Sequence, residues 1–163
     1  MSDSKIVMIT GASRGIGASI LEQCCKQLCS PIIIATARSE AGLDAINTVL
    51  KVQKVNGKSY YFDAASQASV EDFLTQIQAD YPSGPDILVN NAGCTEDNLI
   101  LRMTQSQWDK VMQTNLTSVY RLMKYATRAM LKFSGSRNLL QRFSKRRCAC
   151  KCINQAEVYE CFV

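Results

Sequence analysis

The sequence lacks several features that would place it outside the ordinary globular proteins. No apolar run approaches the roughly 20 residues of a membrane-spanning helix. The first residues, MSDSKIVMIT, lack the basic start, apolar stretch and small-residue cleavage site of a secretory signal. There is no histidine, which excludes the common cysteine–histidine zinc sites, and no internal repeat. These absences predict a cytoplasmic globular protein whose eight cysteines are mostly reduced thiols.

The charge of the chain is distributed unevenly. Residues 1–131 are balanced, so the net charge of +5 lies entirely in residues 132–163. Four of the eight cysteines also lie in that last part. The change in composition predicts two regions: a folded domain over residues 1–132, and a divergent, basic, cysteine-rich tail over residues 133–163 that we expect to be irregular.

Apolar runs and helical stripes alternate along the first region. The sequence predicts strands at residues 5–10, 32–37, 58–64 and 86–93, and the first two contain the apolar runs typical of strands covered on both faces. Helical patterns follow them, beginning after the first glycines, at Ser39, at Ser66 and at Thr104. Strands that alternate with helices of this length predict an α/β fold with a mostly parallel sheet.

Two local predictions concern the side of the first helix that faces the sheet and the turn before the third strand. Ile16, Ile20, Cys24 and Leu28 recur at every fourth residue, which predicts that this stripe of the first helix faces the sheet. The pair at residues 56–57, Asn-Gly, is a turn signal before the third strand.

A glycine-rich segment joins the first strand to its helix. Its spacing, Gly11-x3-Gly15-x-Gly17, differs from the commonest dinucleotide fingerprint. Such a turn places backbone N–H groups and the positive end of the helix dipole at one spot, where a phosphate binds. Taken alone, the glycines are equally consistent with a tight strand–helix connection.

Further motifs carry a family resemblance. The segments at residues 10–17 (TGASRGIG) and 90–93 (NNAG), with Asn115 on the long helix, resemble the short-chain dehydrogenase/reductase family. Residues 95–103 (TEDNLILRM) are most similar to the 3-oxoacyl-[acyl-carrier-protein] reductase branch. The resemblance covers about residues 4–132, and after that the family pattern is missing or replaced. It implies a Rossmann-type, doubly wound parallel sheet that is incomplete at its C-terminal side.

The resemblance also implies a cofactor site and part of a catalytic site. The helix asparagine, Asn115, matches the catalytic asparagine of the family. The positions that match family contacts to a nicotinamide dinucleotide are Gly11, Ser13, Arg14, Gly15, Ile16, Gly17, Arg38, Asp63, Ala64, Asn90 and Gly93.

The choice between NAD(H) and NADP(H) follows from charge. An acidic residue at the end of the second strand would bind the ribose 2′-hydroxyl and repel a 2′-phosphate. This chain has Arg38 there, and Arg14 in the glycine turn. Each arginine alone is typical of a solvated surface, but guanidinium groups at both positions suit a phosphate. The sequence therefore predicts NADP(H).

Three of the four side chains that the family uses for hydride transfer have no counterpart. The family tyrosine donates a proton to the carbonyl oxygen, with a lysine four residues on, and a serine orients the substrate. After residue 132 the only tyrosine is Tyr159, and no serine there has a strand-like setting. Tyr120 and Lys124 have the right spacing but lie on the helix of Asn115, as an ordinary surface pair would.

Three functions stay open on this sequence. The first is a cofactor-binding chain with little or no turnover, and the second is an active NADP(H)-dependent reductase of 3-oxoacyl or related carbonyl substrates. The third is a non-catalytic partner that forms a homo- or hetero-oligomer with full-length relatives. That partner role would use either the long helix or an outer edge of the fourth strand, which we expect to be uncovered because later family strands are missing.

The tail offers two sharper alternatives. Its basic cluster at residues 145–151 could contact nucleic acid or an anionic membrane, but no aromatic platform or amphipathic stripe accompanies it. Cys148, Cys150, Cys152 and Cys161 do not have the usual zinc spacing. We therefore expect neither nucleic acid, membrane nor metal as a partner.

Overall fold

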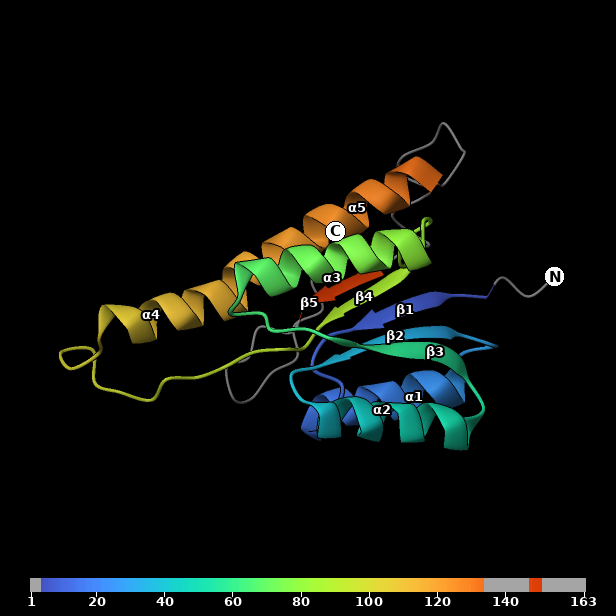
Figure 1. The fold of residues 1–163 in the computed structure, drawn as a ribbon, viewed down its shortest axis with the longest axis horizontal. Helices are drawn as coiled ribbons and strands as arrows, with labels where there is room; N and C mark the ends of the chain where they lie inside the picture. Colours follow the sequence, from blue (N-terminus) through green and yellow to red (C-terminus); the bar gives the residue numbers. More distant parts are fainter. Residues whose placement is uncertain (1–3, 134–146, 151–163) are drawn as a thin grey trace.

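A computed structural model gives the structure of the chain and describes residues 4–133 and 147–150 (Figure 1). Strands and helices alternate, which confirms the predicted α/β order. In chain order they are β1 (Ile6–Ile9), α1 (Gly15–Gln27), β2 (Ile32–Ala37), α2 (Glu40–Gln53), β3 (Asn56–Tyr61), α3 (Gln67–Asp80), β4 (Ile87–Asn90), α4 (Gln105–Met112), the π-helical turn η1 (Gln113–Thr117), α5 (Ser118–Phe133) and β5 (Arg147–Cys150). Over this described part, no helix is both long and apolar enough to cross a bilayer.

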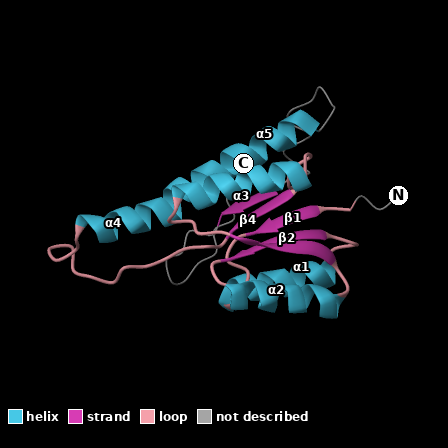
Figure 2. Cartoon of the chain, in the orientation of Figure 1, coloured by secondary structure: helices cyan, strands magenta, loops and turns pink. Residues whose placement is uncertain are grey.

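The strands form one parallel sheet in the order β3-β2-β1-β4-β5 (Figure 1). Figure 2 shows the sheet, in magenta, between two layers of helices. The chain first builds outward from β1 to β2 and β3, and then returns to place β4 on the other side of β1. This is the Rossmann-type arrangement. The reversal of direction makes the carboxyl ends of β1 and β4 the switch point, where sheets of this kind bind ligands.

Helices cover both faces of the sheet, with α1 and α2 on one face and α3 and α5 on the other (Figure 1). Side chains of β1 alternate between two apolar clusters, as successive strand residues must. Val7 and Ile9 pack with the α1–α2 side, whereas Met8 packs with the α3–α5 side. All three are fully buried. The continuous apolar run of β1 therefore arises because both faces of the strand are covered.

The outer edge of β4 is covered, contrary to the sequence-based expectation. Residues Ile87–Asn90 pair in parallel with Arg147–Cys150 of β5. The prediction of an open edge is therefore wrong, and so is an irregular backbone for this part of residues 133–163. The physical reason is that a strand edge presents backbone N–H and C=O groups, which any extended segment can pair with. The remaining tail lies outside the described residues.

The inward face of α1 differs from the predicted stripe by one residue. The buried positions are Gly17, Leu21 and Cys25, whereas Ile16 is 55% exposed. Ile20 and Cys24 are only partly buried beside the core. The helix turns this way because Gly17 has to face the glycine turn, where no larger residue fits. Leu21 and Cys25 then follow on the same face at four-residue spacing.

The predicted turn at Asn56-Gly57 is also wrong, because both residues belong to β3 and pair with Ile32 and Ile33 of β2. The chain reverses two residues earlier, at Lys54, which ends α2 in the left-handed conformation with φ of 53°. Gly57 is required by packing instead: a Cβ there would lie 2.4 Å from the carbonyl oxygen of Ile33. By contrast, the predicted cap at Ser39 is confirmed, since its hydroxyl accepts a hydrogen bond from the Gly42 amide.

Candidate functional site

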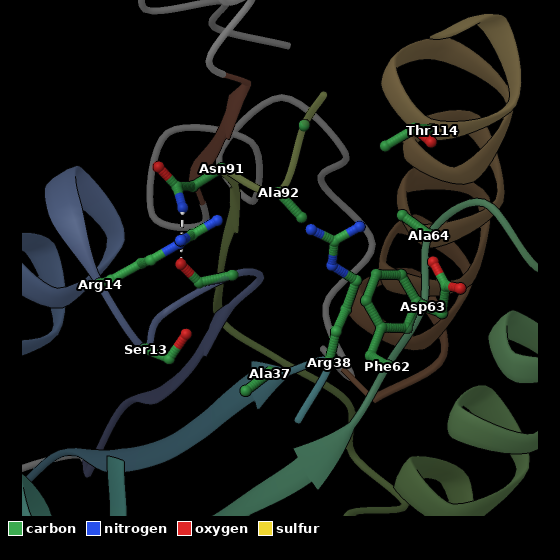
Figure 3. A pocket seen from close by; sticks show the side chains of 12 residues that line it. Ser13, Arg14, Ala37, Arg38, Phe62, Asp63, Ala64, Asn91, Ala92 and Thr114 are labelled. Carbon is green, nitrogen blue, oxygen red and sulfur yellow. Dashed lines mark hydrogen bonds between the residues drawn. The ribbon is translucent and has the colours of Figure 1, made fainter. Parts of the chain in front are cut away.

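A pocket lies at the carboxyl ends of β1, β2, β3 and β4, at the switch point of the sheet (Figure 3). Seven of the residues predicted for the cofactor line it, namely Gly11, Ser13, Arg14, Arg38, Asp63, Ala64 and Gly93. Five predicted residues do not: Gly15, Ile16, Gly17, Asn90 and Asn115. The strand ends thus bring together residues that are more than 80 positions apart in the sequence.

The first wall of the pocket is the glycine turn between β1 and α1. Gly11 and Gly15 have φ of +66° and +57°, in the left-handed region that favours glycine. Gly17 has an ordinary φ but no room: a Cβ there would lie 2.1 Å from the carbonyl oxygen of Gly11. The three glycines therefore have two different tasks, to turn the chain and to let α1 begin directly against the turn.

The second wall, after β4, is held to the glycine turn by hydrogen bonds. The Thr10 hydroxyl accepts from the backbone amides of Asn91 and Ala92, both at 3.0 Å. The Asn91 side-chain amide donates to the carbonyl oxygens of Thr10 at 2.9 Å and Gly11 at 3.0 Å. Asn91 does not belong to the predicted site. Its role is positional: it joins the two segments that enclose the switch point.

The start of α1 suits an anion. Its first turn contains no acidic side chain, and its N-cap residue Arg14 makes no side-chain capping bond. The first amide groups of the helix therefore keep their positive dipole end without an internal counter-charge. Such an end, next to a glycine turn, is the arrangement that binds phosphate in dinucleotide-binding proteins.

Two arginines approach the pocket from different elements. Figure 3 shows Arg14, at the start of α1, and Arg38, directly after β2, directed toward the same space. Both residues are exposed, so their guanidinium groups can meet a ligand without a large desolvation cost. Neither makes an ion pair within the described residues, so both charges are available to an anion.

Asp63 lies at the opposite side of the pocket, after β3. Its side-chain oxygen accepts a hydrogen bond from the Ala65 amide at 3.0 Å, and its own amide donates to the Ser69 hydroxyl. These bonds fix a tight turn that presents Asp63 and Ala64 to the pocket (Figure 3). A carboxylate held in this way can accept a hydrogen bond from a ligand amino group.

Asn115 lies beside the pocket but is occupied with the backbone. Its side-chain oxygen accepts from the Cys94 amide and its side-chain nitrogen donates to the Cys94 carbonyl, both at 2.9 Å. It sits in the π-helical turn between α4 and α5, and π turns of this kind are frequent at functional sites. Its neighbour Thr114 is the residue of this turn that lines the pocket.

The loop after β4 is also tied to α4. Lys110 forms an ion pair with Glu96, and this pairing raises the pKa of the Lys110 ammonium. The Asn98 side chain donates a hydrogen bond to the side-chain oxygen of Gln107, also on α4. The residues that follow in the loop, 99–101, are apolar and exposed, with Leu101 95% exposed.

The sequence-based prediction of the site missed five residues that line the pocket. They are Ala37, Phe62, Asn91, Ala92 and Thr114. Each of them directly flanks a predicted residue in the sequence, and Asn91 and Ala92 stand within the quoted NNAG motif. Except for Thr114, which lies in η1, their position at or just after a strand end is the signal that could have found them.

The Tyr120–Lys124 pair does not approach the pocket. Tyr120 is 59% exposed on α5, and the Lys124 ammonium lies 5.7 Å from the centre of its ring. The predicted interpretation as a surface pair agrees with this geometry. Within the described residues there is also no cluster of three or more metal-ligating side chains. The side chains of the four tail cysteines lie outside those residues.

Comparison with known proteins places this geometry in context. The family model for short chain dehydrogenases matches residues 5–137. The 3-oxoacyl-[acyl-carrier-protein] reductase FabG of Escherichia coli is 44% identical over 130 residues, which are 80% of this chain and 51% of that protein. The FabG of Haemophilus influenzae is 44% identical over 128 residues, 78% of this chain and 50% of that protein. The chain thus spans about half the length of these relatives.

Solved structures agree with the fold. L-sorbose reductase from Gluconobacter frateurii, in complex with NADPH and L-sorbose, superposes with a TM-score of 0.72 at 26% identity. The match covers 79% of this chain and 48% of that chain. An alcohol dehydrogenase from Thermococcus sibiricus, in complex with 5-hydroxy-NADP, gives 0.71 at 25% identity and covers 80% of this chain and 55% of that chain.

Proposed function

The chain belongs to the short-chain dehydrogenase family, and on that premise we propose that its pocket binds NADP(H). The observation that carries the proposal is the pairing of a glycine turn that excludes any Cβ at Gly17 with two unpaired arginines, Arg14 and Arg38. The turn and the start of α1 would hold the pyrophosphate, and Asp63 with Ala64 would meet the adenine. Asn90 and Gly93 would lie on the nicotinamide side.

The preference for NADP(H) over NAD(H) rests on Arg14 and Arg38. Asp63, the one carboxylate among the lining residues, lies after β3 and not at the end of β2. An acidic group after β2 would repel a 2′-phosphate, whereas a guanidinium there binds it by charge-assisted hydrogen bonds. The complexes of the two solved relatives with NADPH and 5-hydroxy-NADP support the same choice.

We expect Arg38→Gln to weaken the binding of NADPH and to leave the binding of NADH nearly unchanged. Hydrogen bonds to charged groups contribute about 1.5–3 kcal/mol, which corresponds to a roughly 10- to 100-fold loss of NADPH affinity. NADH affinity should change less than about twofold on the same principle, because no phosphate contact is lost. Titration of both cofactors by calorimetry or NADPH fluorescence measures this difference.

Arg102→Gln is the matched control for Arg38→Gln, because Arg102 is an exposed arginine in the loop before α4 and does not line the pocket. It should leave both affinities unchanged. Equal losses of affinity for NADPH and NADH in Arg38→Gln would contradict the proposed contact between Arg38 and the 2′-phosphate. They would mean that Arg38 contacts a group that both cofactors contain.

The chemistry proposed for this 163-residue stretch is binding without efficient turnover. Bound NADPH supplies hydride to a carbonyl, and the carbonyl oxygen then needs a proton donor poised near working pH. Among the described residues, no tyrosine or lysine lines the pocket, and the one serine that does, Ser13, belongs to the glycine turn. The side-chain amide of Asn115 is hydrogen-bonded to the Cys94 backbone at both ends, so it cannot donate the proton that the carbonyl oxygen needs. The alternative is an active reductase of 3-oxoacyl or related carbonyl substrates, as the names of the FabG relatives suggest.

The two alternatives separate in a direct assay. With the purified chain, NADPH and an acetoacetyl thioester, we expect NADPH oxidation at the rate of the protein-free blank. Tyr120→Phe should behave identically, because Tyr120 lies on the outer surface of α5. Appreciable turnover by the unchanged chain would establish the active reductase, and its loss in Tyr120→Phe would show that the surface pair takes part.

A further inference from the structure

A second site is separate from the cofactor pocket. A groove of about 640 Å³ runs between α3 and α5, which lie side by side on one face of the sheet (Figure 1). It shares no lining residue with the pocket at the strand ends. Because of this separation, its ligand need not be the cofactor or the carbonyl substrate.

The α5 side of the groove carries three cations. Arg121, Lys124 and Arg128 follow one another at three- and four-residue spacing, which places them along one side of the helix. No carboxylate of the described residues pairs with any of them. The one acidic residue among the described lining residues, Glu71 on α3, accepts a hydrogen bond from Gln67 of its own helix at 2.8 Å. Three cations against one carboxylate leave this lining with a net positive charge.

Two donors in the groove lack a partner. Nη1 of Arg121 and the hydroxyl of Tyr125 are covered from solvent, and neither makes a hydrogen bond within the described residues. Burial also raises the pKa of Tyr125, so its hydroxyl keeps its proton. A buried donor without an acceptor costs about 1–3 kcal/mol, more when it is charged. Both side chains would thus gain by turning toward an acceptor placed in the groove.

The remaining lining is mixed: Thr75 and Gln78 on α3 are polar, with the Thr75 hydroxyl donating to the Glu71 carbonyl oxygen, and the other residues are apolar. Leu74 on α3, Pro82 after it and Ala129 on α5 lie along the groove, together with the ring of Tyr125. A small inorganic anion would leave this surface uncovered, and a neutral apolar molecule would leave the cations and donors unmatched. Ligand sites commonly combine apolar walls with a few converging polar groups. The combination fits a molecule with one carboxylate and an apolar body.

We propose that the α3–α5 groove binds an aliphatic carboxylate, with its carboxylate at Arg121 and Tyr125 and its chain along Leu74 and Ala129. A carboxylate accepts two hydrogen bonds in one plane, which matches a guanidinium and an adjacent hydroxyl. Lys124 and Arg128, at the outer rim, add attraction that salt weakens.

The test uses octanoate as the probe, with 1-octanol and inorganic phosphate as matched controls, in calorimetric titrations of the whole chain. We expect octanoate to bind at least tenfold more tightly than either control. Arg121→Gln should weaken the binding of octanoate at least tenfold, and Tyr125→Phe should weaken it about threefold, because each substitution removes a hydrogen-bond donor to the carboxylate. Arg102→Gln, which changes an exposed arginine outside the groove, should have no effect. NADPH affinity should stay unchanged in all three variants, which separates this test from that of the cofactor pocket.

Each contrary result has a definite meaning. Equal binding of 1-octanol would reduce the groove to an apolar surface, and equal binding of phosphate would reduce it to a charge cluster. No binding of octanoate, or unchanged binding in Arg121→Gln, would overturn the proposal. Tighter binding of a hexaglutamate peptide would assign the groove to an acidic protein segment instead and would also overturn it. If Arg121→Gln does not fold, Arg128→Gln serves instead, because Arg128 is exposed. This variant should weaken the binding of octanoate about threefold. An unchanged affinity would count against the site.

Discussion

Replacement of Gly17 by alanine should abolish NADPH binding and strongly destabilise the chain. The new Cβ would lie 2.1 Å from the Gly11 carbonyl oxygen and 2.5 Å from the side-chain nitrogen of Asn91. These two atoms are themselves joined by a hydrogen bond of 3.0 Å. The methyl group can be accommodated only if α1 moves away from the turn or if this bond breaks. Either change opens the phosphate cradle.

The expected cost of Gly17→Ala is about 3 kcal/mol or more of unfolding free energy, as for other overpacked and network-breaking substitutions. NADPH affinity should fall by a factor of about 100 or more, because the amide groups of the turn lose their convergence. Urea unfolding and cofactor titration measure the two effects. If Gly17→Ala bound NADPH as tightly as the unchanged chain, the close approach of α1 to the turn would not be required.

Gly15→Ala provides the control within the same turn. A Cβ at Gly15 meets no atom within 4 Å, but its φ of +57° is unfavourable for alanine. The conformational cost is about 1–2 kcal/mol, and no atom has to move. Gly15→Ala should therefore reduce stability modestly and keep most NADPH affinity. The contrast distinguishes a glycine needed for its φ from a glycine needed for space.

The same contrast shows what the sequence could and could not predict. The order of strands and helices followed from alternating apolar runs, and the phosphate turn from its glycines. The inward face of α1 did not follow, because Ile16 and Ile20 form as convincing a stripe as Leu21 and Cys25. Only the contact between Gly17 and the Gly11 carbonyl decides between them, and this contact depends on tertiary structure.

The strand β5 and the role of Asn115 were beyond the sequence for a similar reason. Residues 147–150 have no pattern that marks a strand, and their pairing comes from the backbone groups that β4 offers. Asn115 carries a family-like motif, but a motif does not reveal that both ends of its amide bind the Cys94 backbone. Asn91 shows the converse case, since its neighbour Asn90 was predicted as a site residue but the bonds of Asn91 to the turn were not.

Those bonds depend in turn on Thr10, and Thr10→Val should be the second most damaging change. Thr10 is 1% exposed, and valine has nearly its shape, so little packing is lost. Its hydroxyl, however, accepts from the amides of both Asn91 and Ala92, and in valine both amides lose their acceptor. Each buried, unsatisfied amide costs about 1–3 kcal/mol. The sum, about 2–6 kcal/mol, is a large part of the roughly 5–15 kcal/mol that stabilises a typical domain.

Two related variants make Thr10→Val interpretable. Thr10→Ser keeps the hydroxyl and should retain most of the stability. Thr36→Val removes a hydroxyl that accepts from one amide only, that of Gly11 at 3.2 Å, and should cost about half as much. The order of urea midpoints should therefore be unchanged chain, Thr10→Ser, Thr36→Val and Thr10→Val. If Thr10→Val unfolded at the same urea concentration as Thr10→Ser, water would have to satisfy the two amides, and the junction between the glycine turn and β4 would not depend on the threonine hydroxyl.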